Sequence, residues 1–433
     1  MTRFVHKITV DQPEIFLQKA LQWANIEREV VFLNNNQQQD NYHSFDTVLA
    51  FDAFTLIQTD YFSAFEDLEV YQQQTRDWLF GYLSYDLKNG IENLSSNNHD
   101  GLFFPDICFF QPRKMILQKG NELTFLYMNM CKNEVQMDIQ QIKNQSIPSD
   151  FSAKNNVNLQ QRTPYETYIS KVKSLQNHIR LGNIYEVNYC MEFYANKAHI
   201  DPLPTYFQLN KISTPPFSSY LKIGDNFILS ASPERFLKKN GNKLVSQPIK
   251  GTAKRSDDSE EDQLLKRNLE IDPKERAENI MIVDLVRNDL SRTAAKNSVK
   301  VEELCKVYSY AQVHQMISTI SSEVRQGTGL KEILTTTFPM GSMTGAPKLS
   351  AMQLIEEHED FKRGLYSGSI GYITPAGDFD FNVVIRSILY NQKEAYLSFS
   401  VGSAITDLAD PDNEYQECLL KANAMKKVVQ GED

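Results

Sequence analysis

Hydrophobic residues follow two different periods in alternating blocks between residues 165 and 429. In one kind of block apolar side chains recur at every second position and the block ends at a turn signal, which is typical of strands in hairpins. In the other kind they recur at intervals of three and four, as an amphipathic helix requires. The strand-type blocks are residues 184–195, 226–236, 243–249, 368–373, 379–389 and 395–401, and the helix-type blocks are residues 165–181, 274–291, 347–358 and 413–429. Hairpins mixed with long helices predict an α+β fold of packed antiparallel β-sheets surrounded by helices.

The first 155 residues have a different texture and define a separate predicted region. Short aromatic-rich runs such as residues 77–86 alternate there with Asn- and Gln-rich loops, which indicates strands and turns. Residues 138–161 are rich in Gln, Asn and Ser and are expected to connect this region to the next one. We therefore expect an N-terminal region over residues 1–155 and a catalytic region over residues 160–430.

The charge and hydropathy of the chain exclude several classes of partner. The 433 residues include 55 acidic and 45 basic side chains, for a formal net charge of −10, and the basic residues form no continuous run. We therefore expect no nucleic-acid partner. No stretch approaches the ~18 apolar residues of a membrane-spanning helix, and residues 1–22 lack the apolar block of a signal peptide, so we expect no membrane partner either.

The cysteines indicate the redox environment. Their number is odd, they are widely spaced, and they form neither a CxxC pair nor a Cys/His cluster. Free thiols of this kind are maintained in a reducing compartment, so we expect a cytoplasmic protein. They are Cys108, Cys131, Cys190, Cys305 and Cys418.

Paired glutamates recur on two of the predicted helices. Glu275 and Glu278 are three residues apart and share a helix face, and Glu414 and Glu417 repeat the spacing with Lys421 on the same stripe. One interpretation is ordinary solvated helix surface. The other is an oxygen site for Mg²⁺, an ion that commonly takes one or two carboxylates and leaves its other positions to water or substrate.

A glycine-rich segment, FPMGSMTGAPKLSAM, precedes the helix-type block at residues 347–358. Gly341 and Gly345 form a turn, and Pro347 suits the first position of a helix. The segment is not a Walker loop, because no G-K-[ST] follows its glycines, so ATP is not indicated. Free N–H groups at such a helix start would suit a carboxylate or a phosphate, although a plain helix entry is the alternative.

Two further basic residues lie in or directly after strand-type blocks. Arg386 lies in DFDFNVVIRSILY, where alternation places it opposite the phenylalanines, either as an edge charge or as a bidentate carboxylate clamp. Lys250 lies in SQPIKGTAKR, sixteen residues after Glu234, either as an edge-strand charge or as a nucleophile. The neighbouring Lys254 and Arg255 would favour the neutral amine that a nucleophile requires.

The motifs PIKGT, DLVRNDLSR, GSMTGAPK, SGSIGYI, IRSILY and EYQECLLK occur in the order found in the chorismate-utilising enzymes, which residues 165–425 resemble. The resemblance implies an anthranilate synthase component I-like fold in which the two regions are intertwined, chorismate as substrate, and Mg²⁺ as cofactor. Within the family, PIKGT resembles the aminodeoxychorismate synthases of para-aminobenzoate and folate synthesis, whereas anthranilate synthases typically carry Ala at the lysine position.

The resemblance also implies roles for individual residues. Lys250 would attack C2 of the chorismate ring, Glu234 would protonate the departing 4-hydroxyl group, and ammonia would then add at C4 and expel the lysine. Glu278 and Glu417 would bind the metal, with Glu275 and Glu414 beside them. The residues expected to line the substrate are Ser342, Tyr366, Arg386, Gly402, Ser403 and Lys421.

Several positions depart from the family pattern. A histidine frequent before the GSMTGAPK segment, expected in a helix, falls on Gln315 with His314 beside it, and neither is assigned a role. Ser403 stands where a glycine is expected, so its backbone N–H is the group expected to serve. Residues 48–54, VLAFDAF, lack the pattern of tryptophan-sensing relatives.

Three alternative functions compete with aminodeoxychorismate synthesis. Lys250 disfavours anthranilate synthase component I, and Glu186 stands where isochorismate-forming relatives place a water-activating lysine. A non-catalytic partner that docks a glutaminase is disfavoured because the lysine, Arg386 and the acidic residues are all present. No G-x-C-x-G nucleophile surrounds any cysteine, so ammonia would come from a separate glutamine amidotransferase subunit or from solution.

Overall fold

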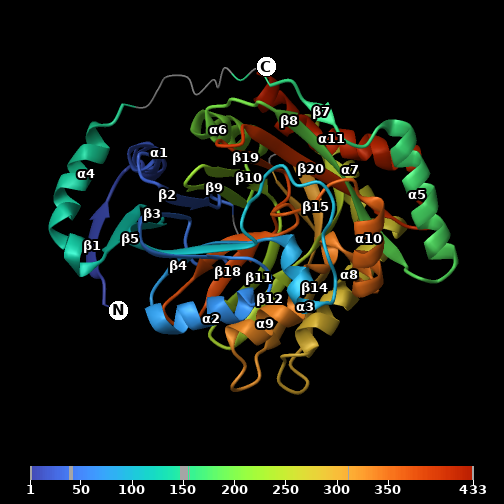
Figure 1. The fold of residues 1–433 in the computed structure, drawn as a ribbon, viewed down its shortest axis with the longest axis horizontal. Helices are drawn as coiled ribbons and strands as arrows, with labels where there is room; N and C mark the ends of the chain where they lie inside the picture. The colour runs from blue at the N-terminus through green and yellow to red at the C-terminus, as the bar shows by residue number, and fades with distance from the viewer. Residues whose placement is uncertain (1, 39–41, 147–154, 156, 311, 432–433) are drawn as a thin grey trace.

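The computed structural model describes residues 2–38, 42–146, 155, 157–310 and 312–431. It confirms the predicted α+β fold, because within these residues the pairings between named strands are all antiparallel and helices lie outside the sheets (Figure 1). None of the helices formed by these residues is long and apolar enough to cross a bilayer.

The strands share one continuous system of pairings. They are β1 (Phe4–Thr9), β2 (Glu29–Asn34), β3 (Thr47–Thr59), β4 (Leu79–Leu83), β5 (Ile107–Lys119), β6 (Glu122–Tyr127), β7 (Gln160–Gln161), β8 (Glu186–Asn196), β9 (Phe217–Ile223), β10 (Asn226–Ser232), β11 (Arg235–Asn240), β12 (Lys243–Gln247), β13 (Ile249–Lys254), β14 (Lys300–Ser309), β15 (Val313–Glu323), β16 (Gly345–Ala346), β17 (Ser369–Ile373), β18 (Phe379–Asn382), β19 (Ser387–Asn391) and β20 (Tyr396–Ile405).

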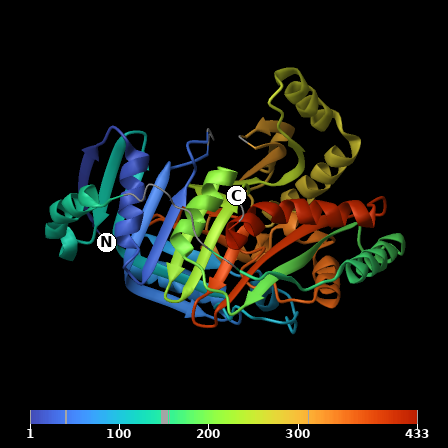
Figure 2. The same ribbon diagram turned by 90° about the horizontal axis from the view of Figure 1, so that it is seen from above.

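The helices connect these strands on the outside of the molecule. They are α1 (Pro13–Ala24), α2 (Ala64–Thr75), α3 (Lys88–Ile91), α4 (Val135–Asn144), α5 (Tyr165–Arg180), α6 (Pro202–Ser213), α7 (Ser259–Ile271), α8 (Pro273–Ser291), α9 (Leu330–Thr337), α10 (Lys348–His358) and α11 (Pro411–Gln430), with short 3₁₀ turns η1 (Tyr85–Leu87), η2 (Asn129–Glu134) and η3 (Gly341–Met343). In Figure 1, α1 and α4 lie at one end of the molecule and α5 at the other. Figure 2 shows α7, coloured olive, standing out from the body.

The N-terminal strands are paired directly with strands of the second half of the chain. β2 pairs with β9, aligning Glu29 with Ile223, and β4 pairs with β17, aligning Gly81 with Gly371. Two large hydrophobic clusters each combine residues from both halves. The division at residues 155–160 stays a prediction. Of the expected connector, residues up to Asn144 belong to α4, and residues 147–154 and 156 lie outside the described residues.

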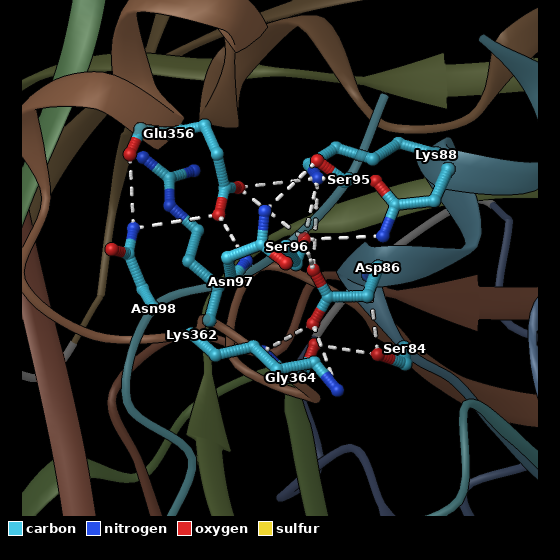
Figure 3. A network of polar contacts seen from close by, with 12 residues as sticks. Ser84, Asp86, Lys88, Ser95, Ser96, Asn97, Asn98, Glu356, Lys362 and Gly364 are labelled. Atoms are coloured by element: carbon cyan, nitrogen blue, oxygen red, sulfur yellow. Dashed lines mark hydrogen bonds and ion pairs between the residues drawn. The ribbon is translucent and has the colours of Figure 1, made fainter. Parts of the chain in front are cut away.

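A polar network provides a second link between the two halves (Figure 3). The Lys88 side chain is fully buried, and its Nζ donates to Ser96 Oγ at 2.8 Å and lies 3.4 Å from Glu356 Oε2 on α10. Asp86 accepts a hydrogen bond of 2.9 Å from the backbone N–H of Gly364. Because a buried cation is costly unless it is paired, this network fixes the segment after β4 against α10 and the loop that follows it.

The structure corrects several sequence-based expectations about elements. The blocks at residues 226–236, 243–249 and 379–389 are each two strands separated by a bend rather than one strand. The N-terminal region also contains helices α1 and α2, which the strand-and-turn interpretation missed. Tertiary packing of their apolar faces determines these helices, and Pro13 begins the first of them.

Candidate active site

A cavity of about 760 Å³ opens between α8, α11 and the bent strands. Its size falls within the range of small-molecule sites. All the predicted site residues line it except Ser403. They are Glu234, Lys250, Glu275, Glu278, Ser342, Tyr366, Arg386, Gly402, Glu414, Glu417 and Lys421.

The two acidic pairs lie in the first two turns of α8 and α11, which begin in the same way. Asp272 caps α8 by accepting from the N–H groups of Lys274 and Glu275, and Asp410 caps α11; a proline follows each cap as the first helical residue. The caps fix where each helix starts and therefore which residues face the cavity. The positive end of the helix dipole also stabilises the carboxylates in the first turn of each helix, Glu275 and Glu414.

The two pairs influence each other electrostatically. Burial raises the pKa of Glu278 to about 7, and burial together with the charge of Glu417 raises the pKa of Glu414. Glu417 itself is exposed to the cavity. Its desolvation acts to raise its pKa, but the positive charge and hydrogen bond of Lys421, 2.6 Å away, act more strongly and lower the pKa. The Lys274 ammonium lies 3.3 Å from Glu414. Several carboxylates therefore share one cavity, and Lys274 and Lys421 neutralise their negative charge only in part.

These carboxylates are chemically suited to a divalent cation. Among the described residues, no three His, Cys, Asp or Glu side chains already converge into a complete metal site. An ion bound by one or two carboxylates does not require such a cluster. Glu278 Oε1 is buried without a hydrogen-bond partner in the described part of the chain, and its nearest cation, Lys274, is 3.9 Å away. A buried carboxylate oxygen that accepts no hydrogen bond and lies beside a second acidic pair fits Mg²⁺.

Glu234 and Arg386 both lie where a strand bends. Glu234 separates β10 from β11, and Arg386 lies just before β19 in the left-handed backbone region, with φ of 50°. The two bends are adjacent, since the N–H of Val383 donates to the carbonyl of Glu234 and the N–H of Ala231 donates to that of Arg386. The prediction that Arg386 projects from a regular strand is therefore wrong. The bend redirects both side chains into the cavity, as irregularities in sheets often do.

Glu234 is held in a form that can donate a proton. Burial raises its pKa to about 7, while Ser342 and Lys250 act in the opposite direction. The Ser342 hydroxyl, from the GSMTGAPK segment, donates to Glu234 Oε1 at 2.6 Å. A carboxyl group with a pKa near neutrality is suited to general acid catalysis at physiological pH.

Lys250 occupies a bulge in β13. The register of β13 against β15 shifts between Ile249 and Thr252, and Gly251 within the bulge has φ of 96°. A side chain at Gly251 would be strained by this backbone, and its Cβ would lie 3.1 Å from Glu275 Oε2. The glycine after Lys250 thus permits a backbone conformation that directs the lysine into the cavity.

The charges around Lys250 differ from the expectation. Burial acts to lower the pKa of this amine, but Glu186, Glu278 and Glu234 outweigh it and raise the pKa above its usual range. Lys254 and Arg255 were expected to favour the neutral amine, but both are exposed, and Arg255 pairs with Asp262 at 2.8 Å. That expectation is wrong, because the carboxylates that act on the amine come from the start of β8, from α8 and from the bend between β10 and β11.

The Arg386 guanidinium lines the cavity, and among the described residues no hydrogen bond or ion pair of its side chain is found. An unpaired guanidinium facing a cavity is well suited to bind a carboxylate in bidentate fashion. The backbone of Gly402 lies nearby on β20, and its carbonyl accepts from Lys421 Nζ at 2.9 Å. A Cβ at Gly402 would lie 2.5 Å from Cys190 Sγ.

The structure separates Ser403 from the other candidates. Its side chain is buried against α5, where its hydroxyl lies 3.0 Å from the hydroxyl of Tyr168. The residue does not line the cavity, so a side-chain contact with substrate is not supported. Tyr366 does line the cavity, and its hydroxyl donates to Cys190 Sγ at 3.6 Å.

Gln315 and His314 lie on β15, not on a helix as expected, and they face opposite sides. His314 is fully buried away from the cavity, between Ser309 at 2.9 Å and Asp262 at 3.0 Å. Gln315 lines the cavity, and its Oε1 has no hydrogen-bond partner among the described residues. Strand alternation in HQMIS could have indicated this separation had a strand been predicted.

Residues 48–54 do not form part of this cavity. Val48 lines a different cavity, of about 60 Å³, together with Phe217 and Tyr372. That volume is far below the several hundred Å³ of typical small-molecule pockets.

Comparison with known proteins finds a matching family and named relatives. Residues 17–427 match the family model described as chorismate binding enzyme. The chain is 38% identical over 369 residues to aminodeoxychorismate synthase, chloroplastic, of Arabidopsis thaliana, a match that covers 81% of this chain and 40% of that protein. It is 32% identical over 353 residues to aminodeoxychorismate synthase component 1 of Escherichia coli, covering 81% of this chain and 76% of that protein.

A solved structure supports the fold independently. Anthranilate synthase component I from Streptococcus pneumoniae superposes with a TM-score of 0.76 at 23% sequence identity, covering 91% of this chain and 94% of the other. The predicted anthranilate synthase component I-like fold is thereby confirmed. With the family model matching nearly the whole sequence, this chain belongs to the chorismate binding enzyme family.

Proposed function

We propose that this chain converts chorismate and ammonia into 4-amino-4-deoxychorismate, the precursor of para-aminobenzoate in folate synthesis. The observation that carries the proposal is the presence of Lys250 in one cavity with Glu234, Arg386 and the acidic pairs of α8 and α11. A lysine there supplies the nucleophile that distinguishes this reaction from anthranilate formation. The names of the Arabidopsis and Escherichia coli relatives agree with this assignment.

The reaction divides into two displacements. The neutral Lys250 amine forms a bond to C2 of the ring, the electron pairs of the two ring double bonds each move one position, and the C4–O bond breaks. Glu234 gives its proton to the departing hydroxyl group, which leaves as water. Ammonia then adds at C4, the double bonds return, the C2–N bond to Lys250 breaks, and the extra proton on the new nitrogen replaces the one that Glu234 gave up. Covalent catalysis of this kind replaces one difficult step with two easier ones.

Other cavity residues bind and orient chorismate, which carries two carboxylates. Arg386 is available for one of them, and Lys421 adds positive charge beside Gly402. Ser342 holds the Glu234 carboxyl group by its hydrogen bond of 2.6 Å, which fixes the direction of proton donation. Orientation of this kind contributes to catalysis by placing the reacting atoms within attacking distance.

Glu278 and Glu417 would hold Mg²⁺, with Glu275 and Glu414 beside them. When bound, the ion would neutralise substrate carboxylate charge that the acidic pairs would otherwise repel. Oε1 of buried Glu278 has no hydrogen-bond partner in the described part of the chain, which supports this role.

The ammonia is proposed to come from a separate glutamine amidotransferase subunit. The name component 1 of the Escherichia coli relative supports a second subunit. The cysteines of this chain also support it, since none lies in a G-x-C-x-G motif and all five are buried. Free ammonium would replace that subunit in a reaction with the isolated chain.

Product identification tests the proposed function. The purified chain is incubated with chorismate, Mg²⁺ and ammonium at alkaline pH, and the products are separated and identified by mass. We expect 4-amino-4-deoxychorismate, and none in a reaction without ammonium. Anthranilate as the main product would reject the assignment in favour of the component I of anthranilate synthase.

A further inference from the structure

Lys250 is in direct contact with a carboxylate that has no role in the reaction described above. Its Nζ lies 2.8 Å from Glu186 Oε1, at the start of β8. Glu186 is only 1% exposed, and its second oxygen, Oε2, has no hydrogen-bond partner in the described part of the chain. A buried carboxylate with one oxygen on an amine and the other unpaired can accept a proton at little structural cost.

The backbone around Glu186 fixes this contact. Ala346 of β16 pairs with Glu186, and the Tyr185 N–H donates to the Ala346 carbonyl at 2.7 Å. Gly345 allows the close approach, because a Cβ there would lie 2.2 Å from the Glu186 carbonyl oxygen. The segment that carries Ser342 therefore also holds Glu186 against Lys250.

Three carboxylates raise the pKa of the Lys250 amine, and two of them have other roles in the proposed reaction. Glu234 must give its own proton to the departing hydroxyl group, and it is already bonded to Ser342. Glu278 belongs to the acidic pairs and forms no ion pair within 4 Å with Lys250. Glu186 is the carboxylate in contact, and it does not line the cavity, so a proton it accepts is not directly exposed to water there.

We propose that Glu186 is the base that removes the proton from Lys250 before attack and returns it when the lysine departs. This inference rests on the proposed function. The ammonium proton moves to a Glu186 oxygen, and the nitrogen lone pair then forms the bond to C2 as the C4–O bond breaks. After ammonia adds at C4, the C2–N bond breaks and the amine regains a proton from Glu186. The neutral acid and neutral amine of the intermediate stage carry no desolvation cost for charge.

The variant Glu186→Gln tests the proposal. Glutamine keeps the size of the side chain and can still accept a hydrogen bond from Lys250, but it cannot accept its proton. We expect kcat for aminodeoxychorismate formation to fall by about 10²- to 10⁴-fold, with KM for chorismate nearly unchanged. The direct readout is the covalent adduct on Lys250, followed by intact-protein mass after mixing with chorismate and Mg²⁺ without ammonium. Its rate of formation should fall by the same factor.

Glu192→Gln is the matched control. Glu192 lies on the same strand and is 4% exposed, but it bonds to Ser398 at 2.6 Å and to Tyr396, away from the cavity. We expect this variant to lose thermal stability while keeping the wild-type rate of adduct formation. Glu186→Asp, which keeps a base at a greater distance, should recover part of the lost rate, whether or not Glu186→Gln is destabilised.

The outcomes distinguish this inference from the proposed function. If the wild type makes aminodeoxychorismate and Glu186→Gln forms the adduct at the wild-type rate, Glu186 is not the base and only this inference is overturned. A slow adduct in Glu186→Gln, with partial recovery in Glu186→Asp, supports it. A wild-type enzyme that makes no aminodeoxychorismate overturns the proposed function first, and this inference with it.

Discussion

Replacing Lys250 with methionine should destabilise the protein through Glu186 as well as abolish activity. At 2.8 Å, two unit charges attract by about 6 kcal/mol for an effective dielectric constant of 20, and desolvation offsets part of this. Removing one partner of a buried pair leaves an uncompensated charge, which typically costs about 3–5 kcal/mol. The Lys250 side chain is 12% exposed and Glu186 1%, so we expect a cost near the lower end, about 3 kcal/mol.

A double-mutant cycle isolates this pair. Urea unfolding at pH 7 is measured for the wild type, Lys250→Met, Glu186→Gln and the double variant. We expect Glu186→Gln to cost only about 1 kcal/mol, because Lys250 keeps the charges of Glu278 and Glu234 nearby. The double variant should be more stable than Lys250→Met, with a coupling of about 2–3 kcal/mol. Additive effects, or a Lys250→Met variant within about 0.5 kcal/mol of the wild type, would refute the assignment of a buried ion pair.

Three other predictions concern the acid, the packing and the metal. Burial raises the pKa of Glu234 from 4.5 to about 7, so about 3 kcal/mol of stability present below pH 4.5 is lost as pH rises through 7. Because Glu278 contributes a loss over the same range, urea unfolding of Glu234→Gln should show a loss smaller than that of the wild type by about 3 kcal/mol, and an equal loss in both would contradict the role of Glu234. Gly402→Ala should lower the free energy of unfolding by about 1–3 kcal/mol, because the new Cβ would lie 2.5 Å from Cys190 Sγ. Adding Cys190→Ala should restore part of the lost stability in thermal unfolding. Equal destabilisation by Gly402→Ala with and without Cys190→Ala would contradict the packing argument. Mg²⁺ at about 100 times its Kd should raise the free energy of unfolding of the wild type by about 2.7 kcal/mol, and chelation should reverse this gain. An equal gain in Glu278→Gln at the same Mg²⁺ concentration would count against Glu278 as a ligand.

Helical spacing predicts the acidic pairs successfully because it is a local property. Glu275 and Glu278 share a face of any helix that includes them, and the Asp272 cap with Pro273 fixes where that helix begins. What spacing does not predict is that the corresponding pair on α11 faces the same cavity. That depends on how distant helices pack around the sheets.

Strand alternation fails at the residues that matter most for chemistry. The run through residues 379–389 alternates well enough to predict one strand, yet it breaks before Arg386, which adopts a left-handed conformation. Glu234 and Lys250 likewise lie at a bend and a bulge. In a regular strand a side chain is held perpendicular to the sheet, so a residue that must point into a cavity beside the sheet requires an irregularity.

The charge around Lys250 was not predictable from its sequence neighbours. Lys254 and Arg255 are close in sequence but exposed, whereas Glu186 is 64 positions away and in contact. An electrostatic environment is determined by distance in space, and hairpins and crossovers bring together residues that are far apart along the chain. Ser403 shows the same limit, because one position along β20 separates the cavity from the core.

The most direct measurement is the reaction of Lys250→Ala with chorismate, Mg²⁺ and ammonium, compared with calorimetric binding of chorismate to the same variant. If the amine attacks the ring, this variant should bind chorismate with a Kd close to that of the wild type and form 4-amino-4-deoxychorismate at least about 10³-fold more slowly. Formation of that product at the wild-type rate would contradict a covalent role for Lys250.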